Sequence, residues 1–141
     1  MADTFVPGSS PKGYPSCRKT ESLVDPVRTE FGWIEVGGTR YEYDIVIHTD
    51  RSITKRKKRL SKPFRGQYGH TPLSAGELEF LAEEKPDIVY IGTGQYGDLP
   101  LTPEAREVLG RYPVRIGPTP EIIEEACAEK RKFAAVLHVT C

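Results

Sequence analysis

The sequence has few of the features that would reveal a chemical activity at once. Its 141 residues include three cysteines, an odd number without a CxxC pair, which argues against a disulfide framework and a structural zinc site. No apolar run approaches the roughly 18 residues that span a bilayer, and the first residues lack the basic and apolar regions of a secretory signal. We therefore expect a cytoplasmic protein, without a membrane partner, whose length fits one domain of ordinary size.

Net charge is also absent, but the charges are unevenly placed. The segment 51–70 carries eight basic residues and no acidic one, whereas the segments before and after it are net acidic. Such a block can bind a phosphate backbone or an acidic partner through its field. The acidic remainder of the chain argues against nucleic acid, because nucleic-acid-binding domains usually have a basic pI. The candidate basic patch consists of Lys55, Arg56, Lys57, Lys58, Arg59 and Arg65.

The first 30 residues are rich in proline, glycine and serine and show no sustained period, which predicts an irregular N-terminal extension. From residue 31 onward, β-branched and aromatic residues become frequent. The segments 31–36 and 40–48, separated by Gly37-Gly38, predict an antiparallel hairpin. A third strand is expected at 52–56, on or near a sheet edge, where lysine is well tolerated.

The rest of the chain alternates between helical and strand patterns. Ser74 and Glu77 fit a capping box that starts a helix, and Thr102 and Thr119 each precede a Pro-Glu pair at a predicted helix start. The apolar segment 133–139 predicts a final strand inside the sheet. The expected fold is an α/β domain over 31–141, with three layers, a central mixed and largely parallel sheet, flanking helices and the preceding antiparallel hairpin element.

A buried strand at 87–91 ends in a glycine-rich loop, which is the best candidate for a ligand site. Ligands of open α/β sheets bind beyond the carboxyl ends of strands, and backbone N–H groups can cradle an anion. The same glycines could instead serve a tight strand exit with positive φ values. The loop matches neither a dinucleotide fingerprint nor a P-loop. With a neighbouring loop histidine, the candidate ligand-binding residues are Gly92, Thr93, Gly94, Gln95, Tyr96, Gly97 and His70.

No catalytic set can be assembled from the sequence. His138 and Cys141 lie three apart on or after a strand, so their side chains should point to opposite faces and not form a dyad. The histidines His48, His70 and His138 have no metal-ligand spacing. We therefore assign no catalytic residue, metal or cofactor.

The order of these motifs resembles a known family. The ending at 135–141, the Phe31-Gly32 opening and the loop at 89–94 are similar to those of a family of small uncharacterised domains, and the segment 62–72 is most like its prokaryotic, especially archaeal, members. Eukaryotic members of that family include the adipogenesis-associated domain protein and a mitochondrial complex I assembly factor. The resemblance covers about 31–141. It implies a three-layer fold with a mixed sheet, and no known reaction.

Three functions follow as hypotheses. The first is a non-enzymatic binding or assembly module with a protein partner, so that an enzyme is disfavoured. The second is a protein or enzyme that binds a small, anionic ligand at the loop 92–97. The third is a nucleic-acid-binding protein that uses the basic strand 55–59. The sequence does not indicate an oligomeric state.

Overall fold

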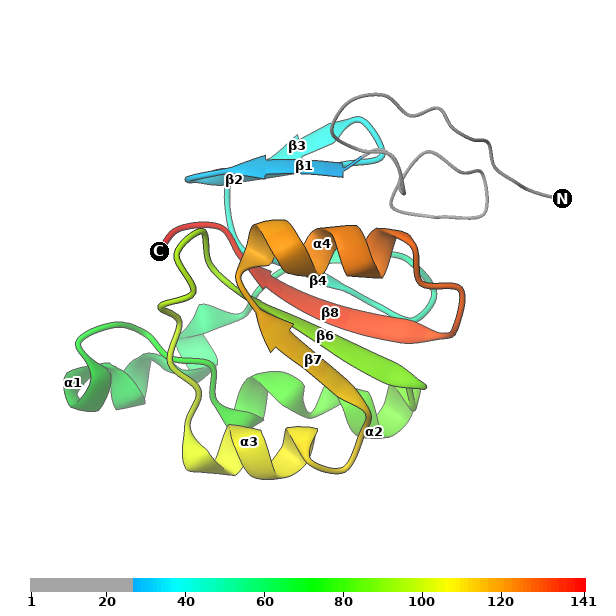
Figure 1. The fold of residues 1–141 in the computed structure, drawn as a ribbon. Helices are drawn as coiled ribbons and strands as arrows, with labels where there is room; N and C mark the ends of the chain where they lie inside the picture. The colour runs from blue at the N-terminus through cyan, green and yellow to red at the C-terminus, as the bar shows by residue number, and fades with distance from the viewer. Residues whose placement is uncertain (1–26) are drawn as a thin grey trace, which may run out of the picture.

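The computed structural model describes residues 27–141, which form two sheets and the helices around them (Figure 1). The first sheet has three antiparallel strands in the order β1-β2-β3, namely β1 (Val27–Glu30), β2 (Trp33–Val36) and β3 (Thr39–Tyr41). Residues 1–26 of the predicted extension lie outside the described residues. The described residues begin at Val27, and the strand β1 occupies the last four residues that the sequence assigned to that extension.

The predicted hairpin is present across Gly37-Gly38, where both glycines have positive φ. Its second arm is shorter than predicted, because β3 ends at Tyr41. The next strand, β4 (Ile45–Ile47), is buried at every position and joins the other sheet. The change of sheet follows from Asp44, whose buried side chain bonds inside the domain and not along the hairpin.

The second sheet has five strands in the order β5-β4-β8-β6-β7, which confirms the predicted mixed α/β architecture. Only β4 runs against the others, since it pairs antiparallel with β5 and β8, while β6 pairs parallel with β7 and β8. The predicted edge strand and the predicted internal C-terminal strand are both confirmed. The bounds are β5 (Ile53–Lys55), β6 (Ile88–Thr93), β7 (Val114–Gly117) and β8 (Phe133–His138).

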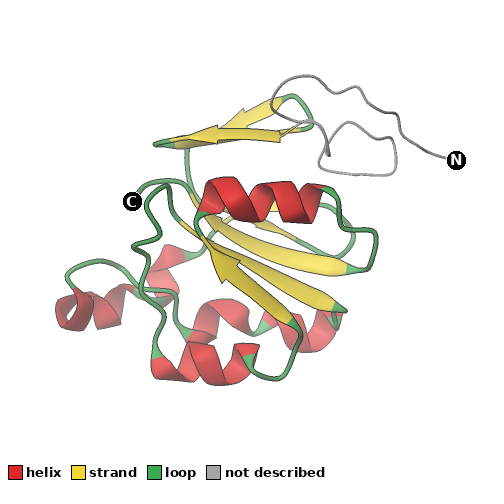
Figure 2. Cartoon of the chain, in the orientation of Figure 1, coloured by secondary structure: helices red, strands yellow, loops and turns green. Residues whose placement is uncertain are grey.

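Helices cover both faces of this sheet (Figure 2). The helix α4 (Thr119–Cys127) lies between the five-stranded sheet and the three-stranded one, and together they bury one apolar cluster around Phe133 and Ile34. The opposite face packs a second cluster, around Leu73 and Ile91, against shorter helices. These are α2 (Phe80–Glu84), α3 (Pro103–Leu109) and the 3-10 helix η4 (Ala75–Leu78).

A run of short helical turns connects β5 to the segment before η4. It consists of η2 (Lys58–Leu60), η3 (Lys62–Phe64) and α1 (Arg65–Tyr68). The predicted basic strand 55–59 therefore ends at Lys55, and the basic residues that follow lie on turns. This matters for the surface, because side chains on a turn need not alternate between two faces as they do on a strand.

Ser74 and Thr102 occupy the predicted N-cap positions, but among the three predicted caps only Thr102 makes a side-chain capping bond. Thr102 caps α3 as predicted, because its Oγ1 accepts a hydrogen bond from the N–H of Ala105. The side chain of Ser74 makes no capping bond, and Thr119 is the first residue of α4 and not its cap. Both hydroxyls instead make tertiary hydrogen bonds. Among residues 27–141, no helix has the length and apolar character needed to cross a membrane.

Candidate functional site

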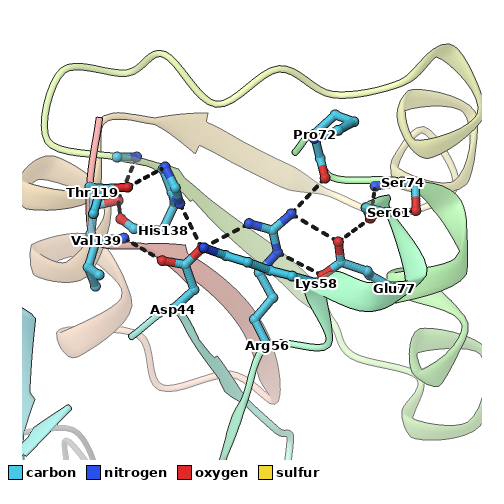
Figure 3. A network of polar contacts seen from close by, with 12 residues as sticks. Asp44, Arg56, Lys58, Ser61, Pro72, Ser74, Glu77, Thr119, His138 and Val139 are labelled. Carbon is cyan, nitrogen blue, oxygen red and sulfur yellow. Dashed lines mark hydrogen bonds and ion pairs between the residues drawn. The ribbon is translucent and has the colours of Figure 1, made fainter. Parts of the chain in front are cut away.

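A buried network of charged side chains lies between β4, β5 and η4 (Figure 3). Its centre is Arg56, only 3% exposed, which follows the edge strand β5. The guanidinium binds Glu77 through two parallel bonds, Nε to Oε1 at 2.7 Å and Nη2 to Oε2 at 2.9 Å. Its Nη1 donates to Asp44 Oδ2 at 2.8 Å and its Nη2 also donates to the Pro72 carbonyl at 2.7 Å. Arg56 thus pairs with two buried carboxylates at once.

Glu77 is held from its other side by two buried serines. The Ser61 hydroxyl donates to Glu77 Oε2 and lies 2.7 Å from the Ser74 hydroxyl. The backbone N–H of Ser74 donates to Ser61 Oγ in turn, at 3.2 Å. The two residues that the sequence assigned to a capping box therefore belong to one network, but Glu77 binds Arg56 and Ser61 and does not reach back to cap the helix.

Asp44 connects the network to the end of β8. Its Oδ2 lies 2.7 Å from His138 Nδ1, and its Oδ1 accepts the backbone N–H of Val139 at 2.9 Å. The ammonium group of Lys58, a half-exposed residue, lies 3.6 Å from the same carboxylate. The second ring nitrogen of His138, Nε2, lies 3.1 Å from Thr140 Oγ1.

The pKa directions follow from these contacts. Burial alone would raise the pKa of Asp44. The hydrogen bond and charge of His138, the N–H of Val139 and the charge of Arg56 outweigh burial and hold the Asp44 pKa far below its usual range. Burial likewise disfavours the charged form of Arg56, but the bonds to Glu77 and Asp44 raise its pKa.

The depressed pKa of Asp44 makes stability depend on pH. A carboxyl whose folded pKa is lowered contributes stability above its unfolded pKa of about 3.9, and that contribution is lost as pH falls toward the folded pKa. We expect Asp44→Asn to be destabilising at pH 7 and the difference from the unsubstituted protein to shrink below about pH 4. Urea unfolding between about pH 7 and pH 2 measures this. Glu125→Gln, on an exposed surface pair, is the control and should show a much smaller difference at every pH. A difference for Asp44→Asn that stays constant with pH would contradict the expectation.

The predicted glycine loop is packed against the residues after β8. The N–H of Gly94 donates to Thr119 Oγ1 at 2.9 Å, that of Gln95 to the Thr140 carbonyl at 2.7 Å, and that of Asp98 to the Cys141 carbonyl at 2.9 Å. The N–H of Gly97 donates to the Gly94 carbonyl. Because these amides already have internal acceptors, they are not available to cradle an anion.

The side chains of the predicted loop site also have structural partners. Gly92 packs against Thr119, and Thr93 is buried and donates to the Gly117 carbonyl at 2.9 Å. Tyr96 is 70% exposed, and its ring lies 6.1 Å from that of Phe31. The positive φ values of Gly94 and Gly97 fit the alternative that the sequence left open, a tight strand exit.

His70 lies in a pocket of about 280 Å³, which shares Lys58 and Thr140 with a larger neighbouring pocket. Its lining residues include His70, His138, Thr140 and Cys141, together with Lys58 and Arg65, but not the Thr93–Gln95 part of the loop. His138 and Cys141 line this pocket together, and no hydrogen bond joins them among the described residues. The sequence did not indicate the pairing of His138 with Thr140, which lies two residues beyond the end of β8.

The basic residues gather at a larger pocket, of about 570 Å³. One predicted member of the patch, Arg56, is buried and paired inside the network, so it is not a free surface cation. Arg65 lines the smaller pocket instead. Lys62, which the prediction did not include, joins the patch because η2 and η3 pack against each other. The cationic lining residues are Lys55, Arg56, Lys57, Lys58, Arg59 and Lys62, and the acidic ones are Glu42 and the buried Asp44.

Two cysteines lie among residues 27–141. Cys127 is buried at the end of α4, and Cys141 is a free thiol that is partly buried.

Solved structures of similar proteins share this fold. PH1505, a conserved hypothetical protein of Pyrococcus horikoshii OT3, is 32% identical with a TM-score of 0.71, and the match covers 82% of this chain and 98% of PH1505. MT938 is 36% identical with a TM-score of 0.66, over 81% of this chain and 96% of MT938. A Bordetella pertussis protein described as a Mth938-like domain is 17% identical with a TM-score of 0.49, over 95% of this chain and 92% of its own, and is too distant to carry an argument.

Neither a protein-family model nor a curated protein matches the sequence. The resemblance to a family of small uncharacterised domains is supported by PH1505 and MT938, but they do not extend it to the adipogenesis-associated protein or to complex I assembly. The chain belongs to the family of small α/β domains that includes MT938 and PH1505.

Proposed function

We propose that this protein is a binding module whose basic pocket accepts a negatively charged group of a partner. The observation that carries the proposal is the chemistry of the 570 Å³ pocket. Within residues 27–141, its cations Lys57, Arg59 and Lys62 form no ion pair with a carboxylate. Cations gathered in a concavity attract anions, and the field is focused by the surrounding low-dielectric protein.

The buried network supports the role of this pocket by fixing its floor. Arg56 and Asp44 line the pocket and are bound to each other, to Glu77 and to the end of β8, so their side chains cannot turn toward a ligand without breaking buried hydrogen bonds. The exposed cations around them remain free to move. Such a rigid floor with adaptable cationic walls suits recognition of a carboxylate or phosphate. An assembly role, as in one member of the resembled family, would place an acidic segment of a protein partner here.

Titration with two probes tests the proposal and distinguishes a protein partner from a small anion as the ligand. The probes are a glutamate-rich peptide, for a protein partner, and inorganic pyrophosphate, for a small anion, each measured by calorimetry at about 50 mM and 200 mM salt. We expect binding that weakens with salt and falls at least about tenfold in the triple variant Lys57→Ala, Arg59→Ala, Lys62→Ala, because each charged hydrogen bond contributes about 1.5–3 kcal/mol.

The matched control is the double variant Arg106→Ala, Arg111→Ala, which removes exposed cations in and just after α3 that do not line the pocket. It should leave both affinities unchanged. The proposal is refuted if neither probe binds at low salt, or if the triple variant binds the probes as tightly as the unsubstituted protein does. A single-stranded oligonucleotide bound far more tightly than the peptide would instead favour the nucleic-acid hypothesis.

A further inference from the structure

A hydrogen-bonded chain joins Asp44, His138 and Thr140 beside the basic pocket, and the proposed binding function assigns no role to His138 or to the Thr140 hydroxyl (Figure 3 shows Asp44 and His138). His138 Nδ1 lies 2.7 Å from Asp44 Oδ2, and His138 Nε2 lies 3.1 Å from Thr140 Oγ1. A carboxylate can only accept, so Nδ1 carries the proton and donates it to Asp44. In the neutral ring Nε2 is then an acceptor, and the Thr140 hydroxyl donates to it. This is the order of groups that activates a hydroxyl nucleophile.

The surrounding bonds hold the imidazole in that orientation. Asp44 is 2% exposed and its position is fixed by the N–H of Val139, the residue between His138 and Thr140. The His138 carbonyl accepts the Thr119 hydroxyl at 2.6 Å, and the Thr140 carbonyl accepts the N–H of Gln95 at 2.7 Å. The base and the hydroxyl are therefore each anchored through their own backbone.

The hydroxyl and the base both line the pocket of about 280 Å³ that also contains His70. Lys58 and Arg65 line the same pocket, and a positive charge beside a carbonyl stabilises the oxyanion that forms when a nucleophile attacks it. The pocket is at the lower end of the size range of ligand sites, which suits a short acyl group. It is lined by a base, a hydroxyl and two cations from segments far apart in the sequence.

We propose that Thr140 accepts an acyl group from a small carboxylic ester, with His138 as its general base and Asp44 as the residue that positions His138. Thr140 Oγ1 attacks the ester carbonyl carbon while its proton passes to His138 Nε2. The bond from that carbon to the leaving alkoxide oxygen then breaks, and the alkoxide takes the proton from Nε2. A water molecule then attacks the acyl carbon while one of its protons passes to His138 Nε2. The bond from that carbon to Thr140 Oγ1 breaks and Oγ1 takes the proton from Nε2, which releases a carboxylic acid and free Thr140. This activity adds to binding at the basic pocket and does not depend on Lys57, Arg59 or Lys62.

Acetylation by p-nitrophenyl acetate tests the proposal directly. The full chain with Cys141→Ala is the parent, because the neighbouring thiol would react with this ester by itself. We expect p-nitrophenolate release and an acetyl group located on Thr140 by peptide mass spectrometry. Thr140→Val, which keeps the side-chain shape without the hydroxyl, should abolish that adduct, and Thr140→Ser should retain it. His138→Gln should slow acetylation by about 100-fold or more, as loss of a general base does.

Thermal melting shows whether each variant is folded, and Thr140→Val leaves Asp44 and its ion pairs untouched, so it tests the hydroxyl even if His138→Gln is unstable. Acetylation confined to lysines such as Lys58, or release of p-nitrophenolate at the parent rate by Thr140→Val, would overturn the proposal. Pyrophosphate or peptide binding is a separate readout, so a failure here leaves the proposed binding function standing.

Discussion

Replacing Arg56 with methionine is expected to lower the free energy of unfolding by about 3–5 kcal/mol. The substitution keeps most of the side-chain volume but leaves the carboxylates of Asp44 and Glu77 buried without their shared cation. It also removes a donor from the Pro72 carbonyl. Breaking one side of a buried ion pair is costly because the remaining charges stay desolvated. Urea unfolding monitored by circular dichroism at neutral pH measures the loss.

The matched control is Arg115→Met. Arg115 binds Glu125 through the same two-bond geometry, Nε to Oε1 at 2.8 Å and Nη2 to Oε2 at 2.9 Å, but on the surface, where its side chain is 58% exposed. An exposed pair contributes at most about 1 kcal/mol. Arg56→Lys should fall between the two, since it retains the charge without the planar fork. A cost for Arg56→Met no larger than for Arg115→Met would show that the buried network is not what holds these elements together.

The sequence predicted the parts of the fold that local patterns control. Gly37-Gly38 marked the hairpin because both residues need positive φ. The continuous apolar run of β8 predicted an internal strand, and the lysine-bearing β5 predicted an edge. Each of these features depends on residues near one another in the chain. The position of β8 agreed with the structure because an apolar terminal strand must be covered on both sides.

The candidate site could not be predicted in the same way, because its contacts join distant residues. Asp44 looked like one polar position in an alternating strand, and its partners Arg56 and His138 lie in other segments. Ser74 and Glu77 matched a capping box, but a buried Glu77 left without Arg56 would cost more free energy than an uncapped helix end does. The one local signal that was available is the short spacing between His138, the last residue of β8, and Thr140.

The glycine loop is a second case in which the sequence could not identify the contacting residues. Glycine allows close approach of any atoms, and the sequence cannot say whether those atoms belong to a ligand or to the chain itself. Here they belong to the chain, since the carbonyls of Thr140 and Cys141 occupy the space beside Gly94. The loop therefore holds the residues after β8 in place, and with them the hydroxyl of Thr140 beside His138.

Gly94→Ala is expected to cost at least about 2 kcal/mol of unfolding free energy, from two effects. Gly94 has φ of +104°, where an L-residue pays about 1–2 kcal/mol. A Cβ there would also lie 2.7 Å from the Thr140 carbonyl oxygen and nearer still to the Cys141 carbonyl, so the backbone must move. Urea unfolding measures the total.

Gly38→Ala separates the two effects, because Gly38 has a similar φ of +89° but nothing within 4 Å of the added Cβ. It should show the backbone cost alone. If Gly94→Ala and Gly38→Ala lower the free energy of unfolding by the same amount, the segment after β8 can shift at no cost, and the packing of the loop does not fix that segment. If Gly94→Ala costs clearly more, the excess measures how firmly residues 140–141 are held. That rigidity helps to keep the Thr140 hydroxyl 3.1 Å from the His138 ring, since the N–H groups of Gln95 and Asp98 donate to the carbonyls of Thr140 and Cys141.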